Sequence, residues 1–87
     1  MIPKVKEARY IQEYKLWLRF SDGKSGVIDL SRELWGPMFE PLKDSSIFRQ
    51  VEVHPELETL SWPNGADFAP EFLYKQVVAE QIAAERQ

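Results

Sequence analysis

The stretch between Tyr14 and Leu30 constrains the fold more than any other part of the chain. Apolar and polar side chains alternate over residues 14–20, a Ser-Asp-Gly triplet interrupts them at 21–23, and the alternation resumes over 26–30. Alternation of this kind is typical of β-strands with one buried face. The stretch therefore predicts an antiparallel hairpin.

The length of the hairpin loop decides which residues face each other. A two-residue Asp-Gly loop would place Leu16 opposite Asp29 and so bury a charge. A three-residue loop, with Gly23 in a left-handed conformation within a bulge, places Leu16 opposite Ile28. It also places Tyr14 opposite Leu30. We predict the three-residue loop, because a one-residue slip would turn every side chain to the wrong face.

Other segments also have strand character. Residues 3–11 predict a first strand, and a change in its apolar period indicates a bulge near Lys6-Glu7. Residues 51–54 and 59–62 predict a second hairpin around a four-residue loop.

Helical signals lie between the hairpins and at the end of the chain. Asp44 is a suitable N-cap for a turn over residues 45–50. Pro70 is well placed as the first residue of a closing helix over 70–86. The whole pattern predicts one α+β domain over residues 1–87, with antiparallel hairpins (about five strands), short helical turns and one C-terminal helix.

Composition excludes several classes of function. The 87 residues include no cysteine, one histidine and four scattered glycines, so thiolate chemistry, disulfides and glycine-rich phosphate loops are absent. We expect no enzymatic activity and no cofactor. No apolar run approaches the ~20 residues of a membrane span, and no basic-then-apolar leader opens the sequence, so we expect a cytoplasmic protein.

Charge is distributed unevenly around a net value of −3. Residues 1–30 hold six basic and four acidic residues, whereas residues 31–87 hold five basic and ten acidic ones. The second part could steer a basic partner. Nucleic-acid binding by this chain alone is disfavoured, because the bases are dispersed rather than concentrated. The alternative of a nucleic-acid-linked regulator would use a basic N-terminal face, which consists of Lys4, Lys6, Arg19 and Lys24.

Aromatic residues suggest where a partner could bind. The predicted register places Trp17, Arg19 and Val27 together on the face opposite the core. Either the closing helix covers this group, or it forms an interaction surface, since exposed aromatic residues beside arginine often anchor interfaces. Trp35 and Trp62 are expected in the core.

One polar cluster has the residue types of a metal site. Alternate residues of an extended chain share a face, so three carboxylates and an imidazole could hold a divalent cation. A solvated strand edge is the preferred interpretation of the same pattern. The cluster consists of Glu52, His54, Glu56 and Glu58.

Two loops complete the pattern, and we expect both to have mainly a conformational role. The first loop, residues 36–42, follows the hairpin. The second loop, within residues 62–67, either starts the closing helix or presents backbone N–H groups to an anion. Their candidate residues, with the hairpin glycine, are Gly23, Gly36, Pro37, Pro63, Asn64, Gly65 and Asp67.

These loops carry a family resemblance. Residues 36–42 (GPMFEPL) and 62–67 (WPNGAD), together with 20–23 (FSDG) and 28–30 (IDL), resemble the bacterial family Domain of Unknown Function 2442 over about residues 3–74. The resemblance implies a compact α+β module and no assigned catalytic residue. Ala69 stands where relatives often have an acidic residue, which leaves Asp67 as a substitute helix cap.

The same resemblance implies interaction and regulation rather than catalysis. Some relatives look like the first part of longer chains that end in a helix-turn-helix-like domain. Genes of short relatives often lie near those of other small proteins, in a toxin–antitoxin-like arrangement. The expected partner is therefore another small protein or a second copy of this chain, and the expected role is that of a regulatory, antitoxin-like member of a small gene pair.

Overall fold

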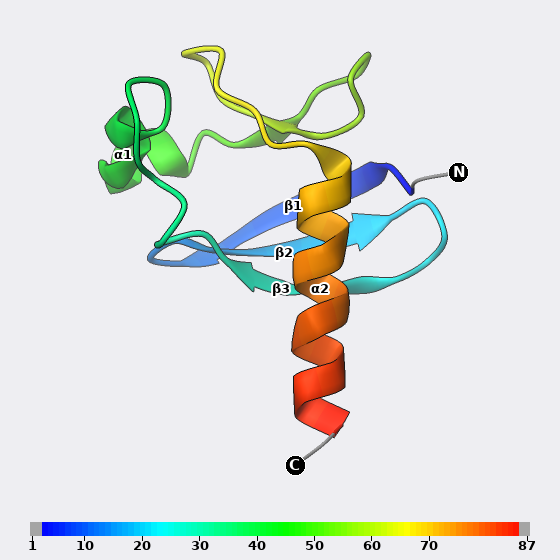
Figure 1. Ribbon diagram of the computed structural model, residues 1–87. Coiled ribbons are helices and arrows are strands. Elements are labelled where there is room, and N and C mark those ends of the chain that lie inside the picture. Colours follow the sequence, from blue (N-terminus) through cyan, green and yellow to red (C-terminus); the bar gives the residue numbers. More distant parts are fainter. Residues whose placement is uncertain (1–2, 86–87) are drawn as a thin grey trace.

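The computed structural model describes residues 3–85, with side chains described as far as residue 80. Its α+β architecture confirms the predicted fold class (Figure 1). The elements are β1 (Val5–Gln12), β2 (Lys15–Phe20), β3 (Ser25–Asp29), the 3-10 turn η1 (Glu40–Lys43), α1 (Ser45–Phe48), β4 (Glu52–Val53), β5 (Leu60–Ser61) and α2 (Pro70–Glu85). The first three strands form one antiparallel sheet in the order β1-β2-β3, and β4 and β5 form a second.

The hairpin of β2 and β3 has the predicted register. Leu16 lies opposite Ile28, and Trp17 lies opposite Val27. The three-residue loop is also confirmed, because the Phe20 N–H donates to the Lys24 carbonyl (2.8 Å) and Gly23 has a φ of +91°. A residue with a Cβ is disfavoured in this left-handed conformation, which explains a glycine there.

Strand β1 contains two irregularities, one of which the sequence analysis missed. The predicted bulge lies between Val5 and Glu7. A second register shift lies between Tyr10 and Gln12, and Ile11 within it is 46% exposed. Ile11 follows Tyr10, which pairs with Leu16 of the buried face, so the alternation along the strand turns Ile11 outward.

The second hairpin is short and is tied to the first sheet. Val53 lies opposite Leu60, and the Val5 N–H donates to the Glu58 carbonyl (3.0 Å). Thr59 and Ser61 are polar residues of this hairpin, and both are buried. The reason is that the following chain folds back over them: Ser61 forms a β-bridge with Asp67, and the Thr59 hydroxyl donates to the Phe68 carbonyl.

The core lies between the sheet and the other elements, with α2 across the strands (Figure 1). Leu73 and Val77 of α2 are fully buried against it. Trp62 is in the core as predicted, and its indole N–H donates to the Phe48 carbonyl (2.9 Å). Neither helix in the described residues is long and apolar enough to cross a bilayer.

The boundaries of the two helices differ slightly from the predicted ones. Asp44 caps α1 by accepting a hydrogen bond from the Ser46 N–H (2.9 Å), but the helix ends at Phe48 rather than at residue 50. Helix α2 begins at Pro70 as predicted and ends at Glu85. The last predicted helical residue, Arg86, lies outside the described residues.

The expectation for Trp35 was wrong. Its side chain is 70% exposed, whereas that of Leu34 beside it is 2% exposed. Only one of these two neighbouring side chains enters the core. The smaller leucine takes that position, and the indole is left at the surface.

Candidate functional site

The first candidate surface, which we call the outer sheet face, lies on the side of the β1-β2-β3 sheet opposite the core. Its centre is a row across the three strands, in which Arg9 pairs with Trp17 and Trp17 pairs with Val27. Val27 is 41% exposed and Trp17 is partly exposed. Because α2 packs on the buried face that contains Leu16, it does not cover this row.

Charged residues hold the outer sheet face in a defined arrangement. The Glu7 carboxylate pairs with Arg9 (2.7 Å) and with Arg19 (3.4 Å). The hydrogen bond from Arg9, assisted by Arg19, lowers the pKa of Glu7 below its usual value. The Arg9 guanidinium also lies 5.6 Å from the centre of the Trp17 ring, which is a cation–π distance. Arg19, predicted as an anchor, is thus engaged within the chain.

The basic residues of the N-terminal region are largely matched by carboxylates. Lys4 and Lys6 both pair with Glu58, at 3.3 Å and 2.8 Å, and the hydrogen bond from Lys6 is the main cause of the lowered pKa of Glu58. Since Arg19 pairs with Glu7, three of the four bases suggested for nucleic-acid contact have an acidic partner.

The structure does not gather the four candidate metal ligands into a site. His54 uses its Nδ1 atom to accept hydrogen bonds from the backbone N–H groups of Glu56 and Leu57, each at 3.1 Å. Glu58 faces the two lysines instead of the imidazole. Among the residues that the structure describes, no group of three His, Asp or Glu side chains is placed to hold a metal ion. The loop conformation, rather than a ligand, accounts for the histidine.

The two motif loops, although distant in sequence, meet in space. The side-chain amide of Asn64 donates to the Met38 carbonyl (2.9 Å), and its oxygen accepts from the Ala66 N–H (3.0 Å). The Gly65 N–H donates to the Trp62 carbonyl (2.9 Å). The N–H groups of Gly65 and Ala66 are therefore paired within the turn. We call the bond between Asn64 and Met38 the loop clamp.

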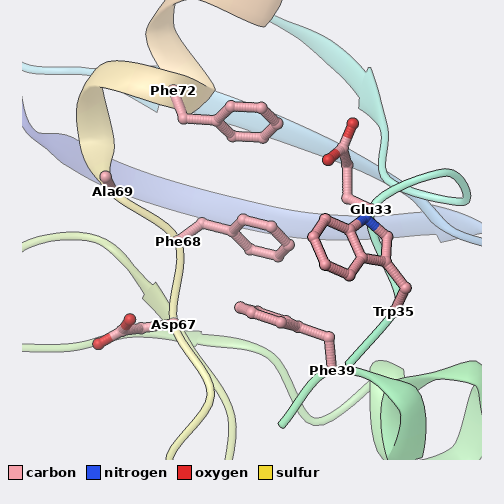
Figure 2. Close-up of a pocket in the computed structure, with 7 residues that line it drawn as sticks. All are labelled: Glu33, Trp35, Phe39, Asp67, Phe68, Ala69 and Phe72. Atoms are coloured by element: carbon pink, nitrogen blue, oxygen red, sulfur yellow. The ribbon is translucent and has the colours of Figure 1, made fainter. Parts of the chain in front are cut away.

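A cleft of about 280 Å³ lies beside the loop clamp and is lined mainly by aromatic side chains (Figure 2). The Phe68 ring is 4.7 Å from that of Phe39 and 5.6 Å from that of Phe72, measured between centres. Figure 2 shows the Trp35 indole across from these three rings. We call this the aromatic cleft, and its lining residues are Glu33, Trp35, Phe39, Asp67, Phe68, Ala69 and Phe72.

The sequence analysis missed the aromatic cleft because it assigned Trp35 to the core. The four-residue spacing of Phe68 and Phe72 across the start of a helix was the available signal, because such spacing brings two side chains to one side. Asp67 was selected as a conformational residue and candidate helix cap. In the structure its backbone bridges to Ser61, and its carboxylate points away from the three phenylalanine rings (Figure 2).

Comparison with known proteins gives one result that bears on these loops. Neither the curated proteins nor the solved structures contain a significant match to the chain. Residues 5–79 match a family model described as a protein of unknown function (DUF2442), a range that includes both motif loops, the outer sheet face and the aromatic cleft. The match covers most of the 87 residues, and the chain therefore belongs to the DUF2442 family.

Proposed function

We propose that this chain is a non-enzymatic protein–protein interaction module of the bacterial cytoplasm, with a regulatory, antitoxin-like role toward another small protein. The observation that carries the proposal is the outer sheet face. Its apolar centre combines Val27, which is 41% exposed, with the partly exposed Trp17, while Leu16, Leu18 and Ile28 on the opposite face of the same strands are buried.

The arrangement of the outer sheet face suits a docking surface. Partner binding would remove Val27 and the exposed Ile11 from water, which provides the hydrophobic driving force. Trp17 lies beneath the Arg9 guanidinium, so little side-chain freedom is lost when a partner covers it. The charged group of Glu7, Arg9 and Arg19 forms a polar rim, which is the usual surrounding of an apolar interface centre.

The test compares two glutamate substitutions in the chain used as bait in its native host. Val27→Glu places an unpaired charge in the centre of the proposed interface, whereas Leu57→Glu places one at a similarly exposed position in the β4–β5 loop (41% and 54% exposed). We expect wild type and L57E to recover the same partner in near-stoichiometric amounts. We expect V27E to recover at least about tenfold less of this partner, because its carboxylate would be buried in the interface without an opposite charge.

Two further measurements make the result unambiguous. Circular dichroism and thermal unfolding of both variants establish that the fold is intact. Sedimentation of the purified chain alone shows whether the bound partner is a second copy. Equal recovery of the partner by V27E and L57E would exclude the outer sheet face as the interface.

A further inference from the structure

The aromatic cleft has two chemically different walls. One is formed by the neighbouring rings of Phe39, Phe68 and Phe72, and the other by the Trp35 indole with Glu33 beside it (Figure 2). A ligand that fits both walls needs an apolar portion and a cationic end.

The Glu33 carboxylate is available to such a ligand. Within the described part of the chain, the ion pairs involve Glu7 and Glu58, and no lysine or arginine nitrogen lies within pairing distance of Glu33. The cleft also belongs to the acidic section of the molecule, since residues 31–87 hold ten acidic and five basic side chains. Charge complementarity therefore favours a basic occupant.

The size of the aromatic cleft limits the ligand to something small. Its volume of about 280 Å³ lies at the lower limit of pockets for small molecules, which usually hold ~300–1,000 Å³. An arginine side chain combines an aliphatic stem with a planar guanidinium, which stacks on indole rings and binds carboxylates through two parallel hydrogen bonds. Each part of this side chain has a counterpart in the cleft.

We propose that the aromatic cleft binds an arginine side chain from a basic segment of a partner protein, with the stem against the phenylalanine edges and the guanidinium between Trp35 and Glu33. This site lies on a different surface from the outer sheet face and does not depend on the function proposed for that face. A failure of one can therefore be distinguished from a failure of the other.

The test is a titration of the intact chain with three short peptides that differ at one position. The central residue is arginine, citrulline or norleucine: citrulline keeps the shape of arginine without its charge, and norleucine keeps only an apolar stem. Binding is followed by NMR at the Trp35 indole N–H and at the backbone N–H of Phe72, which lines the same cleft and remains as a probe in W35L. We expect the arginine peptide to shift these resonances and to bind roughly two- to fivefold more tightly than the citrulline peptide, the range of an exposed cation–π contact.

Two variants assign the recognition to the residues of the cleft. Glu33→Gln removes the carboxylate charge, and Glu56→Gln is the matched control in the exposed β4–β5 loop. Trp35→Leu removes the indole but keeps an apolar side chain at an exposed position. We expect E33Q and W35L each to reduce the preference for arginine over citrulline, and E56Q to retain it.

Three results would overturn the proposal. They are an unshifted Trp35 resonance with the arginine peptide, equal affinity for all three peptides, and an unchanged arginine preference in E33Q. Equal affinity would identify the cleft as a general apolar site instead.

Discussion

The outer sheet face and the aromatic cleft are both exposed and apolar, but they are built in different ways. On the outer sheet face, the pairing of β2 with β3 places Trp17 beside Val27, and the alternation along each strand decides which side chains point outward. In the aromatic cleft, rings from separate segments meet beside the loop clamp, which joins Asn64 to Met38. A surface on regular strands follows from local sequence, whereas a surface between loops depends on contacts between distant residues.

The largest expected effect tests whether residues on the two faces of the sheet contribute to stability as differently as their burial indicates. Leu18 is fully buried on the inner face, and Val27 is 41% exposed on the outer face. We expect Leu18→Ala to lower the free energy of unfolding by about 2–5 kcal/mol, because it leaves a cavity in the core. Urea unfolding measures the change.

Val27→Ala is the matched substitution on the other face. It removes side-chain atoms that already contact water, so we expect a loss of less than about 1 kcal/mol. If L18A and V27A lowered the free energy of unfolding equally, the distinction between an inner and an outer face would be wrong.

A second, smaller effect tests the loop clamp. Asn64→Asp keeps an oxygen that can accept the Ala66 N–H but removes the donor to the Met38 carbonyl. We expect a loss of roughly 1 kcal/mol in the free energy of unfolding, the usual contribution of one hydrogen bond, together with altered NMR resonances of the Phe39 and Phe68 rings.

Gln50→Glu is a matched control for the loop clamp, because it removes a similar amide donor from a local bond to the Ser46 carbonyl (3.1 Å). We expect Q50E to leave the resonances of the aromatic cleft unchanged. The same ring shifts in both variants would show that the clamp has no special role in the cleft.

The smallest expected effect concerns a bond between the β2–β3 turn and α2. The Tyr74 hydroxyl donates to the Asp22 carboxylate (2.7 Å), which lowers the pKa of Asp22 from 3.8 and raises the pKa of Tyr74 from 10.0. The stabilisation is therefore fully present between these two values. It is lost as the pH falls through the lowered pKa of Asp22 and as it rises through the raised pKa of Tyr74.

Tyr74→Phe removes this bond and keeps the ring, whose centre lies 5.1 Å from that of Phe20. We expect the difference in unfolding free energy between wild type and Y74F to be largest near neutral pH and to shrink at both extremes. Urea unfolding across the pH range measures this difference. A difference that does not change with pH would contradict the linkage.

The sequence was sufficient to predict the sheet but not the aromatic cleft. Alternation identified the partners of Leu16 and Trp17 because strand period assigns each side chain to a face. It did not mark the second register shift of β1, which lies between Tyr10 and Gln12. For Leu34 and Trp35, the sequence showed two adjacent apolar residues, and which one enters the core depends on the space that the other elements leave.

The position of the loop clamp has a consequence for the order in which these surfaces arise during synthesis. All three strands of the larger sheet are complete once the ribosome has added Asp29. The aromatic cleft also needs Phe68 and Phe72, so it is missing from a nascent chain that ends at Asn64. A ligand of the cleft would therefore distinguish chains that extend past Phe72 from shorter, unfinished ones.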